Sequence, residues 1–268
     1  MRLDKALLVA KKDWKEAFSS KAMLASLVLS FALTVAVSVL LTAVLALGPD
    51  PGRFMTEEEL AEIRAILPEA SGMTVRQLMA YMVGVIMVPF LFMTMSLAAT
   101  SILTADSFAG ERERKTIEPL LAAPISDSEL FLGKVLASFL PTLTSMYVSF
   151  GLTCLLINML TVGLFGCLWF PPLKTALMVC VLTPAYAFLG MCIVVLGSAR
   201  ASTVKDASNY AAILFFPLLA VFMGQVFGSL IVRTAHLLLA AIILVALDFL
   251  FVRLARHAFS REALIVAR

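Results

Sequence analysis

Long apolar runs separated by short polar segments make up most of this chain. Six runs are long enough to cross a membrane as helices, because a hydrocarbon layer of ~30 Å takes about 20 helical residues. Strands of a membrane barrel would instead alternate in polarity over about ten residues, and no segment here does so. We therefore expect an all-α polytopic membrane protein that forms one domain. The six runs are residues 22–47, 78–104, 135–161, 173–197, 208–227 and 235–252.

The segment before the first run, residues 1–21, predicts an amphipathic helix. Such a helix is typical of one that lies in the headgroup layer with an aromatic anchor. A signal peptide is the alternative, but the apolar run that follows exceeds the ~7–15 residues of a signal-peptide core. The residues at helical spacing on its apolar face are Leu3, Leu7, Ala10, Trp14 and Phe18.

Positive charge is divided unevenly between the two sides of the predicted membrane protein. With the N-terminus inside, five of the 21 lysines and arginines fall outside and all the others fall inside. Cytoplasmic loops carry the excess of Lys and Arg, so we expect both termini and the polar segment 106–134 in the cytoplasm. The net charge of +3 follows from this asymmetry and does not indicate nucleic-acid binding. The five outer residues are Arg53, Arg64, Arg76, Lys174 and Arg233.

Composition supports the membrane interpretation and excludes most catalytic classes. The chain is 61% hydrophobic and 15% charged, whereas soluble domains are nearer half apolar and a quarter charged. It contains no nucleotide-binding glycine loop, HExxH motif or nucleophile elbow. We therefore expect no catalytic site, no metal and no cofactor bound by this chain. The cysteines form no CxxC pair and are interpreted as small apolar residues; they are Cys154, Cys167, Cys180 and Cys192.

Polar residues inside the apolar runs are few, and their pattern favours a role in helix packing over a role in binding a substrate. A stripe in the first run repeats every four residues, at Ser26, Ser30, Thr34, Ser38 and Thr42. Small residues at this spacing let helices approach closely, and their hydroxyls bond either across the contact or back to their own helix. Buried acids in membranes are functional candidates, although Arg253 and Arg256 lie close enough to neutralise Asp248. A possible substrate path would use Ser30, Thr34, Ser38 and Asp248.

Three further patterns concern the shape of the spans and loops. Four runs each contain an interior proline, which kinks a helix and is tolerated in membranes where neighbours satisfy the freed carbonyl. The outer loop, residues 48–77, contains a capping box at Thr56 and Glu59 that predicts a short surface helix. The connection 224–236 is either a tight turn or a re-entrant element. The four prolines are Pro89, Pro141, Pro184 and Pro217.

The polar segment 106–134 is the most charge-dense part of the chain. Charges alternate in sign from Glu111 to Arg114, and Ser126 with Glu129 forms a second capping box that begins a helix. Between them lies a short stretch with an apolar edge. The pattern predicts two helical extensions flanking a short helix that docks in a groove of a soluble partner. The apolar edge is Ile117, Leu120 and Leu121.

The sequence GERERKTIEPLLAAPISDSELFLGK resembles the signature of ABC-2-type transporter permeases, an ERE–T–E–LL–P–GK pattern between the second and third of six spans. A glycine is frequent before the threonine in that family, and Lys115 stands there in this chain. The resemblance implies the type V exporter permease fold, with residues 105–134 as the coupling helix region. The matching residues are Glu111, Arg112, Glu113, Thr116, Glu118, Leu120, Leu121, Pro124, Gly133 and Lys134.

The resemblance also implies how this chain would work. The coupling region would contact an ABC ATPase subunit through Glu111, Arg112, Glu113, Thr116, Ile117, Glu118, Leu120, Leu121 and Pro124. Two ATPase copies would bind ATP-Mg, beside a second copy of this permease or a homologous one, in the cell membrane of a prokaryote. The substrate is not named by the sequence. A membrane scaffold that recruits a soluble protein and an ion-coupled carrier are the alternatives, and scarce charges within the runs disfavour the carrier.

Overall fold

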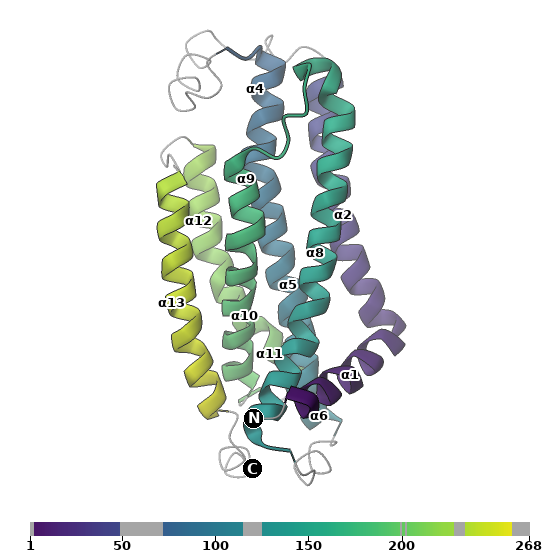
Figure 1. Cartoon of the computed structure of the whole chain (residues 1–268), viewed down its shortest axis with the longest axis vertical. Coiled ribbons are helices and arrows are strands. Elements are labelled where there is room, and N and C mark those ends of the chain that lie inside the picture. The colour runs from purple at the N-terminus through teal and green to yellow at the C-terminus, as the bar shows by residue number, and fades with distance from the viewer. Residues whose placement is uncertain are drawn as a thin grey trace.

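The computed structural model describes residues 3–48, 72–114, 125–198, 200–201, 203–227 and 234–258, and every element in these ranges is a helix. The long helices run side by side, and α1 (Leu3–Ser19) crosses one end of the bundle, as Figure 1 shows. We call this the α1 end. The opposite end, where α2 ends and α4 begins, is the far end.

Six candidate membrane spans are present among the described residues, which confirms the all-helical, six-span prediction. The first and third are single helices, α2 (Lys21–Leu47) and α8 (Asp127–Phe165). The sixth is α13 (Thr234–Ala258). The other three are continuous but irregular. The second is α4 (Val75–Met82), η3 (Val83–Met87) and α5 (Val88–Phe108); the fourth is α9 (Leu173–Leu177), η4 (Met178–Leu182) and α10 (Thr183–Ser198); the fifth is α11 (Val204–Asn209), η5 (Tyr210–Leu214) and α12 (Phe215–Val226).

Capping residues set where two of the spans begin. The predicted box at Ser126 and Glu129 is present, with Glu129 N donating to Ser126 Oγ at 3.3 Å and Ser126 N to Glu129 Oε2 at 3.1 Å. It makes α8 longer than the predicted run 135–161. A second box, Thr74 with Gln77, begins α4 and was not predicted. The box at Thr56 and Glu59 and the centre of the 224–236 connection lie outside the described residues.

Helix α1 packs through its small residues and through Trp14, whose Nε1 donates to Ala137 O of α8. Ala6, Val9 and Ala10 are buried against the bundle, whereas Leu3, Leu7 and Phe18 of the predicted apolar face are exposed. Exposed apolar side chains beside charged ones fit a helix in the headgroup layer.

The hydroxyl stripe of α2 is buried, and most of its bonds stay within the helix. Thr34, Ser38 and Thr42 are almost fully buried, so the stripe does allow close packing, here against α8 and α5. The hydroxyls of Ser26, Ser30, Thr34 and Thr42 each donate to a carbonyl three or four residues earlier, as with Thr42 Oγ1 to Ser38 O at 2.9 Å. The hydroxyl of Ser38 has no hydrogen-bond partner in the described part of the chain.

Three to five residues before each interior proline, a backbone carbonyl accepts a hydrogen bond from a side chain of another helix. Proline lacks the N–H that an earlier carbonyl would accept, and in lipid no water replaces it. The donors are Thr175 Oγ1 to Gly84 O (2.8 Å) before Pro89, Trp14 Nε1 to Ala137 O (3.0 Å) before Pro141, Tyr147 Oη to Cys180 O (3.1 Å) before Pro184, and Tyr186 Oη to Leu214 O before Pro217.

The bonded carbonyls lie at different distances before their prolines. Ala137 lies four residues before Pro141, the α-helical partner position. Gly84 lies five residues before Pro89, where η3 is π-helical and Val88 N bonds Val83 O. Cys180 lies four residues before Pro184, within π-helical η4. Leu214 lies three residues before Pro217, where the 3₁₀ segment η5 meets α12.

Candidate functional site

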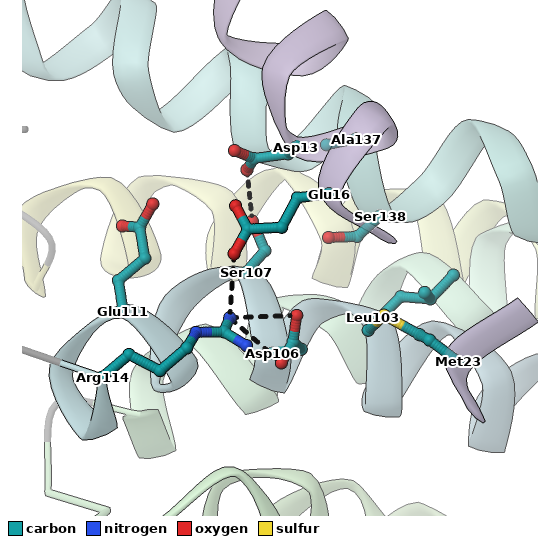
Figure 2. A pocket seen from close by; sticks show the side chains of 10 residues that line it. All are labelled: Asp13, Glu16, Met23, Leu103, Asp106, Ser107, Glu111, Arg114, Ala137 and Ser138. Carbon is teal, nitrogen blue, oxygen red and sulfur yellow. Dashed lines mark hydrogen bonds and ion pairs between the residues drawn. The ribbon is translucent and has the colours of Figure 1, made fainter. Parts of the chain in front are cut away.

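Buried charges gather where α1 crosses the ends of α5 and α8. Lys134 of α8 is fully buried, and its Nζ lies 2.7 Å from Glu111 Oε2. Glu111 is 5% exposed, and its Oε1 accepts a hydrogen bond from Lys12 Nζ at 3.0 Å. Ser107 Oγ donates to Asp13 Oδ2 at 2.9 Å (Figure 2). We call Lys12, Asp13, Ser107, Glu111 and Lys134 the ion-pair cluster.

The surroundings of Lys134 compensate its buried charge. An ammonium group has three protons to donate and is costly to bury unless it is paired. Besides Glu111, Lys134 Nζ donates to Ser107 O and lies 3.9 Å from Asp13 Oδ2. The ring centre of Phe108 is 5.4 Å away, within cation–π range. Lys134 thus ties α8 to α5 and α1 at once.

Two cations at the edge of the cluster are also held by acids. Burial lowers the pKa of Lys12, but its hydrogen bond to Glu111 and the charges of Glu111, Asp13 and Glu16 outweigh this and raise the pKa. Arg114 is 3.2 Å from Asp106 and 3.7 Å from Glu16 (Figure 2). Burial alone would lower the pKa of Arg114, but the interactions with these acids outweigh burial and raise the pKa. Both side chains therefore stay charged at neutral pH.

Helix α6 (Gly110–Glu113) reaches a fourth helix on its other side. Residues two apart on a helix do not face the same way, so Glu113 points away from Glu111. Its Oε2 accepts a hydrogen bond from Val204 N at 2.9 Å, at the start of α11. The hydroxyl of Thr203 caps the same helix by accepting from Asp206 N at 3.1 Å. The ERE sequence therefore connects α1 and α8 on one side with the fifth span on the other.

The glycine before Lys134 permits the close approach of α1. A Cβ atom at Gly133 would lie 2.6 Å from Val9 Cβ and 2.7 Å from Ala6 O. Both distances are shorter than van der Waals contact. Gly133 and Lys134 thus serve the same contact, one by leaving space and the other by its charge.

The space beside the cluster is too small for a substrate. The cavity in Figure 2, between α1, α5, α6 and α8, has a volume of about 20 Å³, whereas small-molecule pockets occupy ~300–1,000 Å³. Among the described residues no group of three His, Cys, Asp or Glu side chains is arranged to hold a metal ion. The arrangement holds helices together and has no groups placed for bond-breaking chemistry.

The structure places only part of the predicted site. Glu111 and Glu113 bond to other helices of this chain, and the side chain of Arg112 is not described. The substrate-path residues do not come together: Ser30, Thr34 and Ser38 lie on α2 and Asp248 on α13, on opposite sides of the bundle in Figure 1. Six predicted contact residues lie outside the described part: Thr116, Ile117, Glu118, Leu120, Leu121 and Pro124.

Sequence reasoning missed the partners of the cluster. The part that Lys12, Asp13 and Ser107 take in it was not predicted from the sequence. A buried lysine such as Lys134 needs an acid nearby, and this requirement was the available signal. Arg253 and Arg256 were expected to lie close enough to neutralise Asp248; its Oδ1 is buried with no hydrogen-bond partner among the described residues, and the side chain of Arg256 is not described.

Comparison with known proteins identifies one family. The family model described as ABC-2 family transporter protein matches residues 7–256, which is most of the chain and includes the whole cluster. No curated protein matches.

Proposed function

Because this chain belongs to the ABC-2 family of transporter membrane proteins, we propose that it is the permease subunit of an exporter driven by ATP that a separate ABC ATPase subunit hydrolyses. The chain is a multi-pass membrane component of such a transporter. Export, the number of ATPase copies and the pairing with a second permease copy are parts of the proposal. ATP-Mg would bind to the ATPase subunits.

The ion-pair cluster is the observation that carries this proposal. It fixes both ends of the segment 115–124, since Glu111 and Lys134 pair across it at 2.7 Å. The same residues contact α1, α5, α8 and, through Glu113, α11. A displacement of α6 and of the start of α8 would therefore be transmitted to four helices through these contacts.

In the proposed mechanism, ATP binding draws two ATPase subunits together and displaces the coupling region. Ile117, Leu120 and Leu121 fill a groove of the ATPase, and Glu111, Arg112 and Glu113 orient the junction. Helices α6 and α8 then move with the cluster and shift the proline-containing spans. Both termini and the α1 end lie in the cytoplasm, in keeping with the distribution of Lys and Arg.

The first test is co-purification. We expect Leu120→Asp with Leu121→Asp to abolish recovery of the ATPase with a tagged permease, because two carboxylates cannot enter an apolar groove unpaired. The matched variant, Leu120→Met with Leu121→Met, keeps apolar side chains of similar size and should retain the ATPase. Unchanged co-purification and unchanged substrate-stimulated ATP hydrolysis in the aspartate variant would contradict the proposal. Recruitment without any substrate-stimulated hydrolysis would indicate a scaffold.

A further inference from the structure

A second cavity lies among spans two, four, five and six, apart from the ion-pair cluster. Its volume is about 420 Å³, within the ~300–1,000 Å³ of small-molecule pockets. The walls are mostly apolar and come from four helices. They include Phe90 and Met93 of α5, Leu182 of η4, Leu218 and Phe222 of α12, and Leu244 of α13.

Irregular helix segments shape two of these walls. Ile86 lies in π-helical η3, and Met178 and Leu182 lie in π-helical η4. Such segments occur frequently at functional sites. Next to these segments, Thr175 Oγ1 donates to Gly84 O of η3, and Tyr186 Oη donates to Leu214 O before Pro217.

Polarity along the cavity has a direction. Gln225 lies in the last turn of α12 and His236 in the first turn of α13. Here α12 ends and α13 begins, on the side of the bundle away from α1. In Figure 1 this side of α12 and α13 does not reach as far from α1 as the tops of α4 and α8 do. The lining deeper in the bundle is apolar apart from Tyr186, whose hydroxyl is already bonded. An amphiphile has the same order, with a polar head at the helix ends and a chain in the hydrocarbon layer.

The cavity also opens toward lipid. Two of its lining residues, Val221 and Ile243, are 42% and 51% exposed on the outer faces of α12 and α13. An empty apolar cavity forfeits dispersion contacts, and water finds few polar partners in it. The acyl chains of the bilayer are the apolar molecules that surround this opening.

We propose that this cavity binds one acyl chain of a bilayer phospholipid, with the headgroup beside Gln225 and His236. The chain enters between α12 and α13 and lies along Leu218 and Leu244. The site is contained within one permease chain and does not involve the α2 stripe. It stands on the cavity alone, independently of coupling to an ATPase.

Photocrosslinking tests the proposal directly. Photoleucine is placed at Leu218 in the full chain, which is reconstituted in vesicles of phosphatidylcholine and phosphatidylethanolamine, and adducts are identified by mass spectrometry. Leu218 is only 8% exposed, so a phospholipid adduct requires an occupied cavity. Photoleucine at Leu189, buried in α10 and absent from the lining, should give no lipid adduct.

Two variants show whether the adduct comes from the cavity. Ala240→Phe fills it and should abolish the lipid adduct at Leu218, whereas Ala246→Phe, on the exposed face of the same helix, should leave the adduct unchanged. Equal lipid labelling at Leu218 and Leu189, or labelling that persists in Ala240→Phe, would overturn the proposal. An adduct to a second permease chain would overturn it in favour of a subunit contact. None of these readouts needs the ATPase, so the result is separate from the test of the proposed function.

Discussion

Lys134 carries a full positive charge to a position that water does not reach. Its partners come from sequence positions as distant as Asp13 and Glu111. Replacing both members of such a pair with apolar residues is often tolerated, whereas removing one leaves a buried charge unpaired. Comparing single with double substitutions therefore shows whether the protein needs this ion pair itself or only needs neither charge to be left buried alone.

We expect Lys134→Met to lower the free energy of unfolding by about 3–5 kcal/mol, because Glu111 is left buried without its nearest cation. Lys134→Met with Glu111→Leu should recover much of the loss. Lys12→Met is the control, since half of the Lys12 side chain is exposed and its loss should matter less. Thermal unfolding in detergent micelles measures all three, and an equal loss in the single and double variants would contradict the ion-pair interpretation.

A glycine pair on α8 tests the approach of α1. Gly133→Ala should displace α1, because the new methyl group would meet Val9 and the Ala6 carbonyl. Gly151→Ala on the same helix meets nothing within 4 Å and should be neutral or stabilising by up to ~1 kcal/mol. Limited proteolysis of α1 reports the difference. Equal protection of α1 in both variants would show that the close contact is dispensable.

At the scale of helices, the four prolines are the clearest feature. Shortly before its proline, each of these spans accepts a hydrogen bond from a side chain of another helix, so each proline site is also an attachment between two elements. Trp14 joins α1 to α8, and Tyr147 joins α8 to the fourth span. The contacts thus link α1 with two successive spans.

Removing one such donor should loosen a span without unfolding the protein. Tyr186→Phe removes the side-chain hydrogen bond to the Leu214 carbonyl and should cost about 0.5–1.5 kcal/mol of stability. Tyr210→Phe is the matched control, because the Tyr210 hydroxyl makes no hydrogen bond within the described part of the chain. The midpoint of thermal unfolding would fall in the first variant only; the same midpoint in both would contradict this role.

The membrane spans could be predicted from the sequence, but the contacts that join the spans could not. Hydropathy is a property of consecutive residues, so six helices and the Ser126 capping box could be predicted. The donors at the prolines come from other helices, and nothing near Pro141 in sequence indicates Trp14. The charges at Glu111 and Lys134 were recognised as part of a motif, but their pairing depends on how α5 and α8 meet.

For the whole molecule, the arrangement separates two regions. The ion-pair cluster occupies the α1 end, and the apolar cavity lies toward the opposite ends of α12 and α13. Charged residues of the cluster and the connection between α8 and α9 fall on opposite sides of the six spans. A label at each side therefore tests the proposed orientation.

Cys167, exposed beyond the end of α8, should react with a membrane-impermeant maleimide in intact cells, and Cys167→Ser should remove the labelling. A cysteine placed at exposed Ser19, in a Cys167→Ser background, should react only after the membrane is permeabilised. The reverse pattern would place the α1 end outside and contradict the orientation.

The pairing of Glu111 with Lys134 also acts as a non-covalent staple. It closes a loop between positions 23 residues apart, and a closed loop has fewer conformations than one with free ends. A protein that binds residues between these two positions therefore loses less conformational entropy on binding, which raises affinity without adding a contact. The strength of subunit association would thus depend partly on a pair of charges that the partner never touches.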